Sequence, residues 1–192
     1  MSAPFEEAVL RAVLEPALGE GLLEVGTATG TAYADIAPHR WHDAVGAARD
    51  GLGLAWFDWL AGVDELEEGL RVVVSLLAPD GAHRGHGVLL RTLADRSAPQ
   101  VPSLVDLFAG AAWHEREAHE MFGIDFAGHP GLRPLLLPDG FDGHPLRKDF
   151  VLASRVARPW PGEHEPSGRS RRRNLPPGVP EPGTWGAGEA GS

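Results

Sequence analysis

Two runs in the middle of the chain alternate apolar and polar residues with the period of a β-strand. The first covers residues 70–79 (LRVVVSLLAP) and the second covers residues 86–96 (HGVLLRTLADR), with an Asp-Gly turn signal between them. Residues 31–37 (TAYADIA) and 54–62 (LAWFDWLAG) are also typical of strands, and an acidic turn follows the latter. The side chains that the alternation places on one side are Leu70, Val72, Val74 and Leu76 in the first run, and Val88, Leu90 and Thr92 in the second.

Helical spacing marks two segments that precede and separate these strands. The first begins near Pro4, which suits the first turn of a helix, and ends at Pro16 and Gly19, whereas the second opens at Pro38. The order helix–strand–helix–strand–strand–strand indicates an α+β fold, a small mostly antiparallel sheet with helices packed on one face. The apolar positions at helical spacing are Phe5, Val9, Val13 and Leu14 in the first helix, and Trp41, Val45 and Ala48 in the second.

A third helix is expected over residues 104–122, followed by chain without regular structure. Ser103 and Asp106 have the spacing of a capping box, and Gly123 is a typical stop signal. The buried stripe of this helix would be Leu104, Leu107, Phe108 and Ala111. Residues 123–150 are irregular apart from one short apolar run at 135–137, and residues 151–192 hold 7 Gly and 7 Pro.

These features divide the chain into three parts. Residues 1–102 form the α+β domain, and residues 103–150 hold the third helix and the irregular segment. The composition of residues 151–192 is too poor in apolar side chains to bury a core, so we expect an extended or disordered tail, or one ordered only against a partner.

Composition and charge remove several classes of function. The 192 residues include no cysteine, which excludes disulfides, thiolate nucleophiles and cysteine-ligated iron–sulfur clusters. The longest apolar runs fall far short of the roughly 18 residues that span a bilayer, and Glu6 and Glu7 stand where a signal peptide would be basic, so we expect a soluble chain. Residues 1–150 carry 11 basic and 23 acidic side chains, a net charge of −12, and residues 151–192 carry 6 and 4, a net charge of +2. An acidic body argues against binding of nucleic acid.

The densest group of chemical side chains is WHEREAHEMFGIDFAGHP, residues 113–130, which suggests a zinc hydrolase at first sight. His114 and His119 are five residues apart, so about 140° separates them on a helix and they cannot share one ion. Glu115 and His119 have the i, i+4 spacing of half a metal site, which leaves a zinc hydrolase as a remote alternative. Glu115 and Glu117 point apart, which disfavours glycoside hydrolysis. Arg116 and Glu120 have the spacing of a helix ion pair.

The remaining charges favour recognition of a protein over proton transfer. His129 and His144 each precede a proline, and the simplest interpretation is a rigid turn in which the imidazole hydrogen-bonds the backbone. Fixed charges of both signs on a stiff, proline-rich path suit contact with another protein, where arginine forks onto carboxylates. We therefore call residues 123–150 the docking segment and expect no active site in this chain. The charges of this path are Arg133, Arg147, Lys148 and Asp149.

Residues 110–150 (GAAWHEREAHEMFGIDFAGHPGLRPLLLPDGFDGHPLRKDF) resemble the signature of a known family, the C subunit of the NADH–quinone oxidoreductase, bacterial respiratory complex I. The later stretch GHPLRKDF, residues 143–150, is similar to a second characteristic stretch of that family. The strong part of the resemblance covers about residues 103–150, and residues 30–100 agree only in their α+β layout. The matching positions of the first stretch are Glu115, Arg116, Glu117, Glu120, Met121, Phe122, His129, Arg133, Leu135 and Leu136.

The resemblance implies a non-catalytic, cofactor-free scaffold subunit of the complex's peripheral arm. FMN, iron–sulfur (Fe-S) clusters and quinone would be bound elsewhere in the complex, which passes electrons from NADH to quinone and couples this to proton translocation. The partners would be the quinone-site subunit and the terminal Fe-S subunit of the same complex, at the cytoplasmic face of the plasma membrane, with membrane contact only through the complex. The implied interface residues are Glu115, Arg116, Glu117, Glu120, His129, Arg133, His144, Arg147, Lys148 and Asp149.

Four positions differ from the residues usual in the family, and they leave a second assignment open. Glu120 stands where Asp is usual, and Pro134 where a second Arg is common. Phe141 replaces a frequent Trp, and Val151 replaces a Pro. The alternative is the corresponding subunit of a paralogous complex with another electron donor, ferredoxin or F420, or of a membrane-bound hydrogenase.

Overall fold

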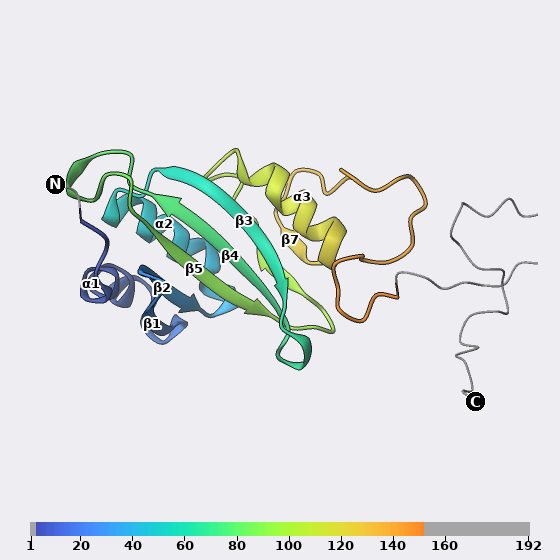
Figure 1. Ribbon diagram of the computed structural model, residues 1–192, viewed down its shortest axis with the longest axis horizontal. Helices are drawn as coiled ribbons and strands as arrows, with labels where there is room; N and C mark the ends of the chain where they lie inside the picture. Colours follow the sequence, from blue (N-terminus) through green and yellow to red (C-terminus); the bar gives the residue numbers. More distant parts are fainter. Residues whose placement is uncertain (1–2, 152–192) are drawn as a thin grey trace, which may run out of the picture. The chain divides into compact units, whose positions relative to one another are not determined.

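Five strands form the sheet at the centre of residues 3–151, the part of the chain that the computed structural model describes (Figure 1). The strand order is β1-β2-β5-β4-β3, and every neighbouring pair is antiparallel except β2 and β5. The predicted α+β fold with a mostly antiparallel sheet is therefore confirmed. The strands are β1 (Leu22–Ala28), β2 (Thr31–Ile36), β3 (Trp56–Asp64), β4 (Leu70–Leu77) and β5 (Gly87–Ala94).

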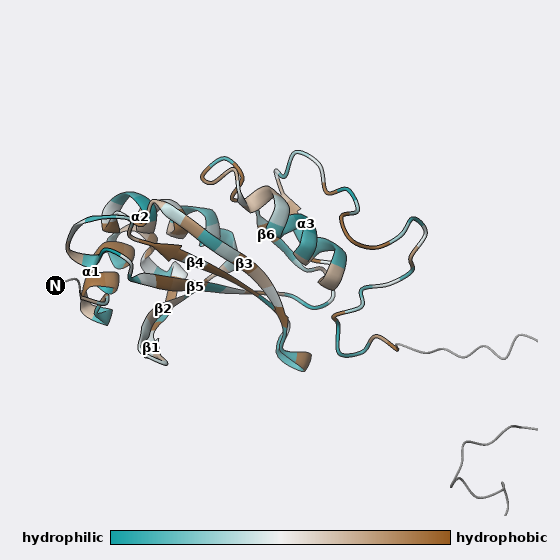
Figure 2. Ribbon diagram, turned by 45° about the horizontal axis from the view of Figure 1, so that its top comes forward, coloured by the Kyte–Doolittle hydropathy of each residue, from teal (hydrophilic) through white to brown (hydrophobic). Residues whose placement is uncertain are grey.

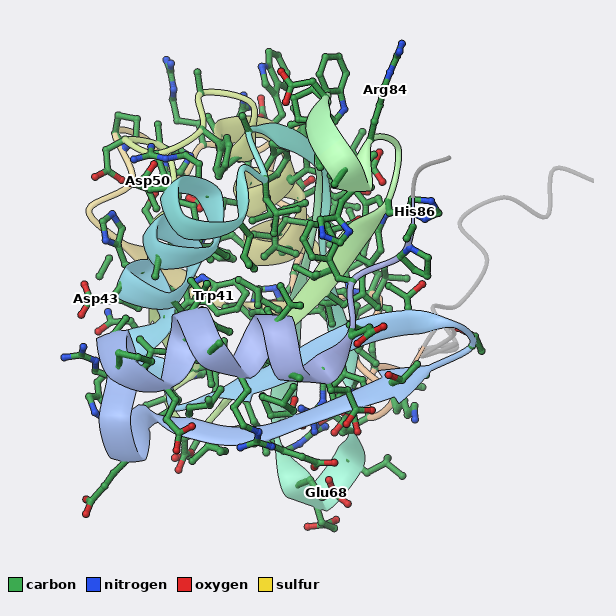
Figure 3. The ribbon with its side chains drawn as sticks, turned by 90° about the vertical axis from the view of Figure 1, so that its left-hand side faces the viewer. Trp41, Asp43, Asp50, Glu68, Arg84 and His86 are labelled. Carbon is green, nitrogen blue, oxygen red and sulfur yellow. The ribbon has the colours of Figure 1, made fainter. Side chains whose placement is uncertain are left out.

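Two helices, α1 (Glu7–Leu18) and α2 (Trp41–Leu52), cover one face of this sheet. In Figure 1 α2 lies behind β4 and β5, and Figure 3 shows Trp41 between the ribbons of α1 and α2. The alternation in β4 and β5 works as predicted, because the side chains assigned to one side are buried against these helices, and Figure 2 shows β4 as strongly hydrophobic. Short 3₁₀ helices connect the elements at Gly19–Gly21, Pro38–Arg40, Leu66–Glu68 and Gly81–His83.

The opposite face of the sheet is not covered by a helix within residues 3–151. Trp56 and Trp59 on β3 are 60% and 37% exposed there. Asp35 on β2 binds Arg91 of the adjacent strand β5 at 2.6 Å and Arg71 of the next strand, β4, at 3.1 Å. Helices on one face only were predicted, and the structure confirms this arrangement.

A smaller unit lies along the edge strand β3. It contains α3 (Ala111–Phe122) and a parallel pair of short strands, β6 (Gln100–Pro102) and β7 (Asp125–Ala127). A Cβ atom at Gly62 of β3 would lie 2.6 Å from the ring of Phe122, so the absence of a side chain there lets α3 approach the sheet. His114 on α3 covers part of the open edge of β3, because its Nδ1 lies 3.1 Å from the carbonyl oxygen of Leu60.

Four local expectations were wrong, and one of them is that residues 123–150 are irregular, since Asp125–Ala127 forms β7. β1 was missed because only Val25 within it is buried, so an edge strand of this kind lacks the alternation that identified the others. Pro16 does not end the first helix but lies inside its last turn, and the buried face is Leu10, Leu14 and Leu18, with Val9 37% exposed. The third helix begins at Ala111, seven residues later than predicted.

None of the helices in residues 3–151 has the length and apolar character that crossing a membrane requires. Residues 151–192 were expected to form an extended tail, and all of them but Val151 lie outside the described residues.

Two glycine substitutions test the close packing of α3 on the sheet. Gly62→Ala is expected to lower the free energy of unfolding by about 1–3 kcal/mol, because the added methyl group overlaps the packed ring of Phe122. Gly46→Ala in the middle of α2 is the matched control, since its Cβ would meet nothing closer than 3.9 Å, and it is expected to raise stability by about 0.5–1 kcal/mol. Chemical denaturation of both variants measures this, and equal effects from the two would contradict the packing of α3.

Candidate docking surface

The carboxylate of Glu115 fixes α3 to the turn that follows β6. Its side chain is fully buried, at 0% exposure. Its two oxygens accept hydrogen bonds from the hydroxyl of Ser103 and from the backbone N–H of Leu104, both at 2.6 Å. Burial raises the pKa of Glu115 above its ordinary value, and the two hydrogen bonds offset only part of that effect.

This contact explains why the predicted helix over residues 104–122 and its capping box do not form. Residues 103 and 115 would be about 18 Å apart along one continuous helix, at 1.5 Å per residue, and they are instead in contact. Ser103 bonds Glu115, and Asp106 accepts a hydrogen bond from His42 of α2 at 2.9 Å. The chain therefore forms a single turn that starts at Leu104 and ends before α3 begins.

Glu120 fixes the other side of α3 to the docking segment. Its carboxylate accepts three hydrogen bonds, from the consecutive backbone N–H groups of Leu135, Leu136 and Leu137, at 3.0, 2.8 and 2.9 Å. Burial works to raise the pKa of Glu120, but these three donors and the nearby charge of Arg116 outweigh it, so the pKa lies below its ordinary value. The apolar run at 135–137 is thus held as a loop by one carboxylate.

Arg116 binds the carbonyl groups of the same loop. Its Nε and Nη2 donate to the backbone oxygens of Arg133 and Pro134, at 3.0 and 2.7 Å. The predicted ion pair between Arg116 and Glu120 is wrong as a direct contact, because no ion pair joins them within residues 3–151. The two side chains instead bind neighbouring parts of one loop, one through its acceptors and one through its donors.

The two histidines that precede prolines bond the backbone, as predicted. His129 Nε2 lies 3.1 Å from the carbonyl oxygen of Ala112, and its Nδ1 accepts the N–H of Gly131 at 2.9 Å. A carbonyl oxygen only accepts, so Nε2 carries the proton of a neutral imidazole. His144 Nδ1 lies 2.9 Å from the carbonyl oxygen of Glu120 and donates to it in the same way.

Residues 143–150, the second characteristic stretch, pack against the C-terminal end of α3. Gly123 ends the helix with φ of 72°, and its N–H donates to the carbonyl oxygen of His119. A Cβ atom at Gly123 would lie 2.5 Å from His144 Nε2, so the docking segment packs directly on this turn. Arg147 donates through Nε to the carbonyl oxygen of Phe122, and Leu146 N–H donates to that of Met121.

Asp64, at the end of β3, anchors the far end of the docking segment. It is 3% exposed and accepts hydrogen bonds from Arg96 at 2.6 Å and from the N–H of Lys148 at 2.8 Å. Arg96 also binds Asp149 at 3.0 Å. The guanidinium of Arg96 holds the pKa of Asp64 well below its usual range. Asp64 and Arg96 were not predicted, because nothing in their local sequence links them to Lys148 and Asp149, which lie 84 and 53 residues away, respectively.

Most of the ten predicted interface residues therefore form side-chain hydrogen bonds or ion pairs within their own chain, and the other three do not. The side chains of Glu117, Arg133 and Lys148 have no hydrogen bond or ion pair within residues 3–151, and all three residues are exposed. Large apolar side chains accompany them on the surface of α3 and the docking segment. These are Trp113 at 62% exposure, Leu136 at 63%, Phe141 at 42% and Leu146 at 54%.

The histidines of α3 are committed to backbone groups rather than to each other. His114 bonds Leu60, and His119 Nδ1 lies 2.9 Å from the carbonyl oxygen of Ile124. Glu115 and His119, the half-site of the zinc alternative, face different partners. In the described part of the chain, no three His, Asp or Glu side chains are placed to hold one metal ion.

Comparison with known proteins finds a matching family and similar chains. Residues 34–156 match the sequence model of the family described as the respiratory-chain NADH dehydrogenase 30 kDa subunit. The C subunit of the NADH-quinone oxidoreductase of Roseiflexus castenholzii is 39% identical over 145 residues, which is 73% of this chain and 82% of that protein. The C subunit of Brucella ovis is 46% identical over 99 residues, which is 50% of this chain and 47% of that protein, so the match spans about half of that relative.

Two solved structures resemble the fold. A trypsin-resistant fragment of Nqo5 superposes with a TM-score of 0.53 and 26% identity, covering 64% of this chain and 98% of the fragment. A chain of the membrane-bound sulfane sulfur reductase, an archaeal respiratory membrane complex, gives a TM-score of 0.66 at 18% identity, covering 85% of this chain and 95% of that one. The second likeness concerns the fold alone.

The raised pKa of Glu115 predicts a pH dependence of stability. At low pH the carboxyl is neutral in both the folded and the unfolded chain, so it does not change the free energy of unfolding. Above the ordinary pKa of 4.5 the carboxyl ionises first in the unfolded chain, and the free energy of unfolding falls. Glu115→Gln keeps an acceptor and a donor for Leu104 and Ser103 without titrating. The stability of the parent relative to this variant should therefore fall as pH rises above about 4.5, by at most about 1.4 kcal/mol per pH unit. Denaturation curves from pH 4 to 8 test this, with exposed Glu117→Gln as control, and parallel curves for parent and Glu115→Gln would refute it.

The three hydrogen bonds of Glu120 predict a local opening. Glu120→Ala should free the amides of residues 135–137 and lower their opening free energy by about 1.5–3 kcal/mol, which is tenfold faster exchange or more. Hydrogen exchange followed by mass spectrometry measures this. Glu117→Ala, on the same helix but exposed, is the control and should leave these amides protected. Unchanged exchange in Glu120→Ala would show that the loop is held by other contacts.

Proposed function

Because the chain belongs to the family of the 30 kDa subunit of the respiratory-chain NADH dehydrogenase, which includes the C subunit of NADH-quinone oxidoreductase, we propose that it is a scaffold subunit of such a complex. It contributes no active site and no cofactor of its own. The complex passes electrons from NADH through FMN and iron–sulfur centres to quinone and couples this to proton translocation. The chain lies in the peripheral arm, at the cytoplasmic face of the plasma membrane.

One observation carries this proposal beyond family membership. The docking segment has almost no regular structure, yet side-chain bonds to its backbone attach it to α3 and to the sheet, and it exposes large apolar side chains. Fixing an irregular segment costs conformational entropy, and the exposed apolar area gains nothing in water. A rigid, preformed surface of this kind is suited to a permanent protein neighbour.

The proposed interface residues then act in two ways. Buried or backbone-bonded side chains shape the surface from inside, and exposed ones contact the neighbour. Glu115 is assigned to the first group because it is fully buried and cannot reach a partner. The shaping group is Glu115, Glu120, His129, His144 and Arg147, and the contacting group is Glu117, Arg133, Lys148 and Asp149, together with Trp113 and Leu136. Arg116 belongs to both groups, because it bonds the loop backbone and also lines a surface cleft.

The neighbours in this proposal are the quinone-site subunit and the subunit that carries the terminal iron–sulfur cluster. The fold of residues 3–151 also resembles a chain of an archaeal respiratory membrane complex with a different reaction. That likeness concerns the fold, and the second candidate rests on the four positions that differ from the residues usual in the family. This candidate is the corresponding subunit of a paralogous complex fed by ferredoxin or F420, or of a membrane-bound hydrogenase. The two candidates share the docking role and differ in the electron donor.

An affinity pull-down of the tagged full chain from detergent-solubilised membranes tests the proposal. We expect the quinone-site subunit and the NADH-oxidising subunits to be retained together and identified by mass spectrometry. Leu136→Asp should reduce their retention, because binding would then bury a charge where the proposed interface has an apolar side chain. Leu23→Asp on β1 is the matched control, since Leu23 is also 63% exposed, and it should leave retention unchanged.

The possible outcomes separate the candidates. Retention of the quinone-site subunit without NADH-oxidising subunits would support the paralogous complex instead. A chain recovered alone, with equal results for both variants, would contradict the docking role, and stoichiometric zinc in the purified protein would revive the hydrolase alternative.

A further inference from the structure

A cleft on the outer side of α3 gathers positive charge on an otherwise acidic body. It has a volume of about 240 Å³ and is lined by Ala112, Trp113, Arg116, His129, Pro130, Gly131 and Arg133. None of the described residues that line it is acidic. Residues 1–150 carry 11 basic and 23 acidic side chains, so two guanidinium groups in one cleft without a carboxylate contrast with the rest of this surface.

Arg116 is fixed in place before any partner arrives. Its Nε and Nη2 are held by the carbonyl oxygens of Arg133 and Pro134, and its guanidinium lies 5.2 Å from the ring centre of Trp113. A carbonyl oxygen carries no full charge, so these bonds do not neutralise Arg116. The carboxylate of Glu120 is nearby, but it bonds the N–H groups of residues 135–137 and forms no ion pair with Arg116 within residues 3–151. Within residues 3–151 its Nη1 has no acceptor, and the fixed fork leaves this side open to an anion.

The opposite wall is equally rigid. His129 bonds Ala112 on α3 and accepts the N–H of Gly131, which holds the turn at residues 129–131 against the helix. Arg133 follows this turn and is exposed, and its guanidinium has no hydrogen bond or ion pair among the described residues. The cleft therefore offers one fixed guanidinium, one adjustable guanidinium and an indole, 62% exposed, beside them.

These groups match the chemistry of a carboxylate on a protein surface. Arginine forks bind carboxylates with paired hydrogen bonds, and Trp and Arg are the residue types that dominate the energy of protein interfaces. Trp113 adds apolar contact for the methylene groups of a Glu or Asp side chain and shields the charge pair from water. The cleft is also continuous with the surface of α3 and the docking segment that carries the proposed scaffold function.

We propose that the cleft formed by Trp113, Arg116 and Arg133 receives a carboxylate side chain of the neighbouring subunit and sets the register of docking. This inference rests on the proposed scaffold function and adds the chemistry of the partner to it. The pairing acts as a positioning contact, because oriented charges fix specificity at an interface more than they raise affinity.

Zero-length cross-linking in the assembled complex tests the pairing directly. Lys148 is the only lysine of the chain and does not line the cleft, so Arg133→Lys adds a second lysine and places its amine in the cleft. Carbodiimide treatment of the solubilised complex should join position 133 of this variant to an Asp or Glu of a neighbouring subunit, identified by mass spectrometry. Arg84→Lys, an exposed position on the connection between β4 and β5 (Figure 3), is the matched control and should not give this product.

Retention supplies the second measurement. Arg133→Ala should weaken retention of the chain by about tenfold or more, Arg133→Glu further, and Arg133→Lys should restore part of it, whereas Arg84→Ala should have no effect. Circular dichroism of each variant should match the parent, since Arg133 bonds nothing within residues 3–151 through its side chain.

Three results would overturn the inference. An intact complex with no cross-link from position 133 and unchanged retention leaves the scaffold function standing and rejects the carboxylate. Binding of the chain to anionic phosphatidylglycerol vesicles that is lost in Arg133→Ala, without a protein cross-link, would assign the cleft to a lipid headgroup. A chain that retains no complex at all would reject the scaffold function and this inference together.

Discussion

The irregular backbone on both sides of α3 needs acceptors for its N–H groups, and two carboxylates of that helix supply them. A loop packed against protein cannot leave its donors without partners, and no sheet reaches residues 103–104 or 135–137. Glu115 accepts from the first segment and Glu120 from the second. Because the two residues are five apart, they point about 140° from each other around the helix axis, so one helix binds a segment on each flank.

The two carboxylates meet this demand in different electrostatic settings. Glu115 is fully buried with no cation bonded to it within residues 3–151, and burial raises its pKa. Glu120 has three N–H donors and the charge of Arg116 near it, and its pKa is lowered. Ionisation of Glu115 therefore destabilises the folded chain, although its hydrogen bonds hold the turn after β6. Ionisation of Glu120 stabilises the folded chain. Their difference shows that the same residue type on one helix can support structure in opposite ways.

The docking segment is rigid because its bonds come from three separate places. Arg116 and Glu120 hold its first half, backbone groups at the end of α3 hold its middle, and Asp64 with Arg96 holds residues 148–149. With the polar groups of the segment bonded inside, its outer surface is left with apolar side chains and a few unpaired charges. That division suits a preformed interface, and it leaves the guanidinium of Arg133 without a hydrogen bond or ion pair within residues 3–151.

The sequence by itself determined the α+β fold, the strands β2 to β5, the covered face of the sheet and the family of the chain. These rest on local period and on a motif that is contiguous in sequence, such as the alternation from Leu70 to Leu76. Only the tertiary structure decided where α3 begins, which charges are buried and which face outward. Ser103 and Glu115, Glu120 and Leu136, and Asp64 and Lys148 are 12, 16 and 84 residues apart. The sequence around a hydrogen-bond donor does not indicate which distant acceptor it binds, because tertiary packing determines which groups lie within hydrogen-bond distance.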